Sequence, residues 1–172
     1  HGMLLIGGPS KHHHWDNRAL ADQISRVIRF SPDRRWLLST SRRTPPGFAR
    51  LIQQHIHSAS RELEVISWHD TTDDWISEQL ARSTGAWVTE DSVSMVYEAL
   101  TADIPVGLLS VPPRRRSRVV RGLQQLVDAR HVLPFDAWVA GKPLRRSGAV
   151  FNEAERAAQW ICDRWGTVSS GR

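Results

Sequence analysis

The sequence predicts an α/β fold in which an open, mainly parallel sheet of five or six strands lies between two layers of helices. Short apolar segments alternate with amphipathic segments along the whole chain, which is typical of successive βαβ units. At 172 residues the chain is too short for a closed barrel of eight such units, which needs about 250 residues. The expected arrangement is therefore a doubly wound, Rossmann-like three-layer sandwich.

The first half of the chain contains two strands and two helices in alternation. Residues 3–8 (MLLIGG) are expected to form a buried strand that ends at two glycines. Residues 18–30 have apolar side chains three and four positions apart, so they are expected to form a helix. Residues 34–40 form the second expected strand, and residues 47–58 the next helix. Two prolines just before residue 47 suit the first turn of that helix.

The middle of the chain continues the alternation. Residues 63–69, 85–91 and 104–112 are short apolar runs and are expected to be strands. Residues 73–83 begin with acidic side chains, which favour a helix N-terminus. Residues 92–103 are expected to form the helix between the fourth and fifth strands.

The last part of the chain is expected to be mostly helical. Residues 117–132 form a strongly amphipathic segment, which predicts a helix. Residues 133–150 are interrupted by proline and glycine and are expected to lack a long element. Asn152 and Glu155 resemble a capping box, so a final helix is expected to start there and to stop near Gly166.

Composition and charge limit the possible classes of protein. The chain is 40% hydrophobic and 24% charged, which is typical of a globular protein, and we expect one domain over residues 1–172. Cys162 is the only cysteine, so no disulfide can form within the chain and a cytoplasmic location is expected. No apolar run reaches the roughly 20 residues that span a bilayer. The net charge of +5 suits a partner that has phosphate groups, such as a nucleotide, an anionic lipid or a nucleic acid.

In a doubly wound sheet, ligands bind outside the carboxyl ends of the strands. The loop after the first expected strand contains Gly7 and Gly8, whose amides can approach a ligand closely, followed by Ser10 and Lys11. This combination suits a phosphate group. It is neither a GxGxxG nor a Walker motif, and the same residues could form an ordinary structural turn.

The loop after the second expected strand is rich in polar side chains. Arg42 or Arg43 could form a bidentate pair with a diphosphate, and the hydroxyls of Ser41 and Thr44 could orient it. The alternative is a solvated turn in which Ser41 or Thr44 caps the next helix.

The loop and helix after the fourth expected strand begin with Thr89, Asp91 and Ser92. Ser92 and Ser94 are expected in the first turn of the helix, where amides face the ligand edge. Glu98 lies four residues after Ser94 on the same side of that helix, so its carboxylate could accept hydrogen bonds from a ribose diol. The alternative is an ordinary surface glutamate.

Other common types of site are not indicated. Three consecutive histidines at positions 12–14 cannot all face one ion from a regular element, and we expect no metal site. No Ser/His/Asp arrangement is evident, Cys162 is expected to be buried in a helix, and no catalytic residue is assigned.

Three segments together resemble a known family: LIGGPSKHHHW at 5–15, LLSTSRRTP at 37–45, and WVTEDSVSMVYEALTADIPVGLL at 87–109. They are similar to the C-terminal half of the mitochondrial-fission-protein-like family of bacteria and plants. Many bacterial members of that family are described as predicted nucleoside-diphosphate-sugar epimerases. The resemblance runs from about Leu4 to Val111.

That family looks like the GT-B glycosyltransferases, so the resemblance implies the fold of a GT-B C-terminal domain and a nucleoside diphosphate sugar as ligand, UDP-linked sugars among the candidates. It implies no further cofactor. In such enzymes a glycine-rich loop faces the donor, a helix N-terminus receives the diphosphate and a glutamate on that helix binds the ribose. By resemblance these roles fall on Gly7, Gly8, Ser10 and Lys11, on Ser92, Val93 and Ser94, and on Glu98.

The sequence also departs from what these activities need. A GT-B enzyme needs a second domain for its acceptor, so we expect the chain to be the C-terminal half of a larger protein and not to be catalytic alone. Epimerases of the short-chain type need a Tyr-x-x-x-Lys pair, but Thr101 follows the only tyrosine, Tyr97, by four residues. The competing hypothesis is a non-catalytic module that docks to a membrane or a partner through residues 114–118 and exposed tryptophans. Nucleic acid is the least favoured partner.

Overall fold

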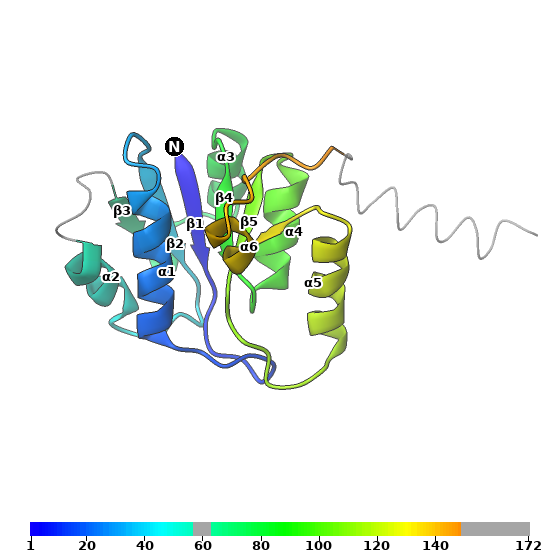
Figure 1. Cartoon of the computed structure of the whole chain (residues 1–172). Coiled ribbons are helices and arrows are strands. Elements are labelled where there is room, and N and C mark those ends of the chain that lie inside the picture. Colours follow the sequence, from blue (N-terminus) through cyan, green and yellow to red (C-terminus); the bar gives the residue numbers. More distant parts are fainter. Residues whose placement is uncertain (57–62, 149–172) are drawn as a thin grey trace, which may run out of the picture.

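The computed structural model describes residues 1–56 and 63–148 of the chain (Figure 1). The helix that we expected from Asn152 to Gly166, including Cys162, lies outside the described residues. None of the helices in those two ranges is long and apolar enough to cross a bilayer.

The core of the described structure is a six-stranded sheet in which every neighbouring pair is parallel, with the order β3-β2-β1-β4-β5-β6. The strands are β1 (Gly2–Ile6), β2 (Trp36–Thr40), β3 (Leu63–Ile66), β4 (Ala86–Thr89), β5 (Val106–Leu109) and β6 (Leu133–Pro134). This sheet confirms the predicted doubly wound, Rossmann-like class.

Six α-helices cover the two faces of the sheet (Figure 1). They are α1 (Asn17–Arg29), α2 (Phe48–Ile56), α3 (Trp75–Ala81), α4 (Val93–Thr101), α5 (Arg118–Asp128) and α6 (Phe135–Val139). Helices α1, α2 and α6 pack in one hydrophobic cluster against one face, and α3, α4 and α5 pack in a second cluster against the other face. Alternate residues of the strands supply the two clusters, as the pleat requires: Leu4 and Ile6 face the first, and Met3 and Leu5 face the second.

Local signals explain where two of the helices begin. The carboxylate of Asp16 accepts hydrogen bonds from the backbone N–H groups of Arg18 and Ala19 at the start of α1, at 2.8 and 3.1 Å. The hydroxyl of Ser117 accepts one from the N–H of Val120 at the start of α5. Such caps satisfy donors that have no partner inside the helix.

The stretch 133–150 contains two elements that we did not expect. Leu133 and Pro134 form β6 beside β5, and α6 follows at once. A two-residue strand and a five-residue helix are too short to produce a recognisable period, so the sequence pattern could not indicate them.

The docking hypothesis needs exposed tryptophans, but the tryptophans of the described residues are buried or partly buried. Trp36 and Trp87 are buried in the core, and the other four tryptophans of the described residues are partly buried. No tryptophan within 1–56 and 63–148 is exposed. The part of the chain that the structure describes therefore offers no exposed tryptophan for such docking.

Candidate functional site

The candidate site lies at the carboxyl ends of β1 and β4. The chain places β1, β2 and β3 towards one side of the sheet and then returns to place β4, β5 and β6 on the other side. The topological switch point is therefore between β1 and β4, which is where doubly wound proteins bind ligands. The loops that follow these two strands contain Gly7, Gly8, Asp91 and Ser92.

The two loops at the switch point are hydrogen-bonded to each other. The N–H of Gly7 donates to the hydroxyl of Thr89 at 2.8 Å, and the N–H of Gly8 donates to the carboxylate of Asp91 at 2.9 Å. A Cβ atom at Gly7 would collide with the Asp91 carboxylate. The close contact between the loops therefore favours glycine here, and the two amides that we expected to face a ligand donate to protein groups.

Arg43 joins a third loop to this contact. Its guanidinium lies 2.8 Å from a carboxylate oxygen of Asp91 and donates to the carbonyl of Gly8 at 2.8 Å. The Asp91 side chain is 0% exposed, whereas that of Arg43 is 41% exposed. We call this ion pair the Asp91–Arg43 clamp. Of the two arginines that we considered for a diphosphate, Arg43 thus already has its guanidinium paired with a protein carboxylate.

The hydroxyl groups of the loop after β2 also bind the loop after β1. Thr44 donates to the carbonyl of Gly7 at 2.6 Å, and Ser41 lies in hydrogen-bonding reach of the same carbonyl at 3.0 Å. The N–H of Ser41 donates to the Thr44 hydroxyl at 2.8 Å. The two side chains thus bind the end of β1, in place of the ligand or the helix cap that we considered.

Ser10 has a structural role too. Its hydroxyl accepts hydrogen bonds from the N–H groups of His12 and His13, both at 3.2 Å, and so closes a turn. Lys11 is exposed beside that turn. Among the four residues predicted in the first loop, Lys11 alone has a polar group that forms no hydrogen bond or ion pair within the described part of the chain, and it lies at the predicted edge.

Arg42 differs from its neighbour. It is exposed, and it forms no ion pair within the described ranges. Its guanidinium lies 5.7 Å from the centre of the Trp68 ring, in the 3₁₀-helix η1 (Trp68–Asp70) that follows β3. Both residues line a hollow of about 510 Å³ between the loops after β2 and β3. Arg42 is therefore a cation available to a ligand at this edge.

The start of α4 provides the other feature available to a ligand. Ser92 is the N-cap residue, but its side chain makes no capping hydrogen bond. Val93 and Ser94 form the first turn, as predicted, and Ser94 is exposed. Backbone N–H groups without a side-chain cap, together with the positive end of the helix dipole, suit an anion.

Glu98 lies on α4 where the sequence placed it, four residues after Ser94. It is partly buried, and its carboxylate forms no hydrogen bond or ion pair with the residues of 1–56 and 63–148. Burial raises the pKa of its carboxyl group above the usual value. The side chain is thus available to accept hydrogen bonds from a ligand.

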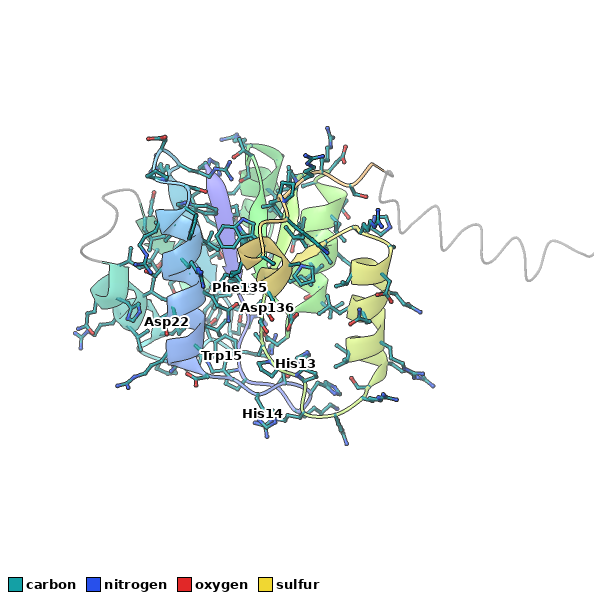
Figure 2. The ribbon with its side chains drawn as sticks, viewed as in Figure 1. His13, His14, Trp15, Asp22, Phe135 and Asp136 are labelled. Atoms are coloured by element: carbon teal, nitrogen blue, oxygen red, sulfur yellow. The ribbon has the colours of Figure 1, made fainter. Side chains whose placement is uncertain are left out.

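Glu90 is a site residue that sequence reasoning missed. Its carboxylate accepts a hydrogen bond from the N–H of Val111 at 2.9 Å. Burial raises its pKa to about 7, against the opposing effect of that hydrogen bond, and the charges of Asp136 and Asp91 add to the rise. Figure 2 shows Asp136 on α6 in front of the sheet. The only sequence signal was a carboxylate directly after a buried strand.

The histidine segment is fixed by the loop after β5, near the lower edge in Figure 2. The N–H of His14 donates to the carbonyl of Pro112, and Arg114 donates from its backbone to His12 and from its side chain to His13. His13 is buried, which lowers its pKa. Among the described residues, no group of three His, Cys, Asp or Glu side chains is arranged to hold a metal ion.

The parallel sheet, its strand order and the loop edge at the switch point define a Rossmann-like α/β protein. The chain belongs to the mitochondrial fission ELM1 family, whose model matches residues 1–165. This confirms the family that the motifs indicated, and the match extends well beyond Val111.

Solved structures are similar to the chain at low sequence identity. The MAR1 ribonuclease from Caenorhabditis elegans matches with a TM-score of 0.52 and 8% identity, covering 99% of this chain and 96% of that one. An FMN-dependent UbiX-like decarboxylase from Escherichia coli O157:H7 matches with a TM-score of 0.46 and 13% identity, covering 99% and 100%. The first likeness supports the α/β fold alone. No curated protein matches the chain.

Proposed function

We propose that the chain is a nucleoside-diphosphate-sugar-binding domain of the glycosyltransferase-like, GT-B type. The observation that supports this most directly is the uncapped first turn of α4 at the switch point of the sheet. Family membership and the motif resemblance are consistent with the same ligand class.

The contacts in the structure change which residues we assign to the diphosphate. The amides of Gly7 and Gly8 and the guanidinium of Arg43 are already bonded to protein groups. We therefore assign the diphosphate to the N–H groups of Val93 and Ser94. Charge neutralisation is assigned to the exposed cations Arg42 and Lys11.

The ribose is assigned to Glu98. An ionised carboxylate accepts two hydrogen bonds from a diol, and Glu98 lies on the helix whose first turn receives the phosphates. Since burial raises its pKa, acid pH protonates Glu98 earlier than an exposed glutamate. The proposal therefore includes weaker binding at acid pH than at neutral pH.

Sugar transfer would also need an acceptor site and a catalytic base, and we assign neither to this chain. The proposal places the acceptor site and the catalytic base on a second domain, and it makes this chain the donor-binding half.

Isothermal titration calorimetry with UDP, GDP and their sugars tests the proposal. We expect saturable binding by the wild-type chain and clearly weaker binding by Glu98→Ala. The matched control is Glu78→Ala, which removes an exposed glutamate from α3. Absence of binding at millimolar ligand would refute the proposal. A Glu98→Ala variant that binds as tightly as wild type would remove the ribose role and leave the phosphate role.

A further inference from the structure

The surface of interest lies at the edge of the sheet opposite to the candidate site. Helix α1 returns antiparallel to β1, so Phe30 at its end is next to the amino ends of the strands (Figure 1). Phe30 is 68% exposed, the largest exposure of any large hydrophobic residue in the described part of the chain. Val139, at the end of α6, is 39% exposed.

Packing holds these apolar side chains in place. The ring of Phe30 lies edge-on to that of Trp138, with centroids 5.4 Å apart. Trp138 in turn packs against Trp87 at 5.1 Å and Phe135 at 5.7 Å. Phe30 therefore packs against a cluster of aromatic rings, although most of its surface is exposed to solvent.

Basic side chains surround this apolar centre. A hollow of about 320 Å³ lies between the end of α1 and the end of α6, and Arg26 and Lys142 line it together with Phe30 and Val139. The guanidinium of Arg26 lies 6.0 Å from the centre of the Phe30 ring. No carboxylate lines this hollow among the described residues.

A second hollow continues the basic surface. It has a volume of about 720 Å³ and shares Lys142 with the first. Arg130, Arg145 and Arg146 also line it, against one carboxylate, Asp128. Arg146 is paired with Asp103, so the other cations remain in excess. We call the combined area, defined by Arg26, Phe30, Arg130, Val139, Lys142 and Arg145, the apolar–basic surface.

We propose that the apolar–basic surface docks the protein onto a membrane that contains anionic lipids. Phe30 and Val139 would enter the interfacial region, and the basic side chains would contact lipid phosphates. Aromatic rings with neighbouring Lys and Arg side chains are typical of membrane interfaces. Each basic residue close to an anionic surface strengthens binding roughly fivefold.

Other occupants fit this surface less well. A stable protein interface buries about 800 Å² on each partner around an apolar centre, and two exposed apolar side chains are a small centre for it. A second copy of the chain would bring like charges together, because the basic residues surround Phe30 on both copies. A lipid surface needs only a shallow apolar contact with positive charge around it.

The proposal is independent of the proposed function. The apolar–basic surface and the start of α4 lie at opposite edges of the sheet. Docking through the apolar–basic surface leaves the start of α4 facing away from the membrane. Membrane binding and nucleotide binding can therefore each fail without the other.

Sedimentation with vesicles tests the docking surface. The full chain is mixed with phosphatidylcholine vesicles and with phosphatidylcholine–phosphatidylserine vesicles, over a series of salt concentrations. We expect salt-sensitive binding to the second kind alone. Phe30→Ser should weaken that binding, and the double variant Lys142→Gln with Arg145→Gln should weaken it roughly 25-fold, from about fivefold for each residue.

Matched controls separate this surface from general charge and apolarity. Val119→Ser removes another exposed apolar side chain, on α5, and Arg115→Gln with Arg116→Gln removes two charges at the carboxyl edge. Both controls should bind vesicles like wild type. Phe30→Leu should retain binding, and thermal unfolding checks that each variant is folded.

Three results would overturn the proposal. The first is no binding to anionic vesicles by the wild-type chain. The second is equal loss in the control variants, which would indicate attraction by net charge. The third is a concentration-dependent dimer in analytical ultracentrifugation that Phe30→Ser abolishes, which would assign the surface to a second copy of the chain.

Discussion

Replacing Arg43 with alanine removes the cationic half of the Asp91–Arg43 clamp. The Asp91 carboxylate is 0% exposed and would retain the N–H of Gly8 as its one hydrogen-bond donor among the described residues, because its other oxygen has no partner there. Removing one partner of a fully buried ion pair costs about 3–5 kcal/mol. Arg43 is 41% exposed, so water can reach part of the gap, and we expect Arg43→Ala to lower the free energy of unfolding by about 2–4 kcal/mol.

Urea denaturation of a double-mutant cycle measures this effect. Asp91→Asn keeps an oxygen that can accept a hydrogen bond from Gly8 but removes the buried charge. In the Asp91→Asn background, Arg43→Ala should therefore lower the free energy of unfolding by about 1 kcal/mol less than in wild type, or by even less than that. Arg42→Ala is the matched control and should change stability by less than about 0.5 kcal/mol, because its side chain is exposed. A loss below about 0.5 kcal/mol in Arg43→Ala, or strict additivity in the cycle, would refute a structural clamp.

Three further predictions concern single residues. Gly8→Ala should destabilise the fold by about 1–3 kcal/mol in urea titrations, since the new Cβ would collide with the backbone carbonyl of Arg43. Gly122→Ala should instead stabilise it by about 0.5–1 kcal/mol, because the site is open and lies inside α5; an equal loss in both variants would contradict the steric argument. Glu90 has a folded pKa of about 7 against a usual 4.5, so the folded state keeps a proton that the unfolded chain releases, and stability falls as pH rises between these values. Glu90→Gln should therefore gain up to about 3 kcal/mol over wild type at pH 8 and almost nothing at pH 4.5, whereas Glu78→Gln on α3 should show no such trend.

The sequence predicted most of the fold because long elements leave periodic patterns. The helix expected at 18–30 appears as α1, and the helix expected at 117–132 begins one residue later, as α5. Parallel pairing also follows from the alternation of strands and helices, since parallel neighbours need crossover connections. The short pair β6 and α6 left no pattern, although Trp138 of α6 fills the core beside Trp87.

The sequence also predicted which loops meet at the site, but not how their side chains pair. Gly8, Arg43 and the loop before α4 converge on one edge because they follow parallel strands. Whether Arg43 faces a ligand or a protein carboxylate depends on the burial of Asp91, which is a property of the tertiary packing. The raised pKa of Glu90 has the same origin, because it results from burial beside α6 and the strand ending before Val111.

The central claim is that the first turn of α4 receives a diphosphate at the switch point of the sheet. Two-dimensional ¹H–¹⁵N NMR during titration with UDP tests it most directly, with uridine as the matched compound that lacks phosphates. The account predicts saturable shifts of the Val93 and Ser94 amide signals with UDP and none with uridine. Unchanged signals of these amides at millimolar UDP, or shifts confined to another part of the chain, would contradict it.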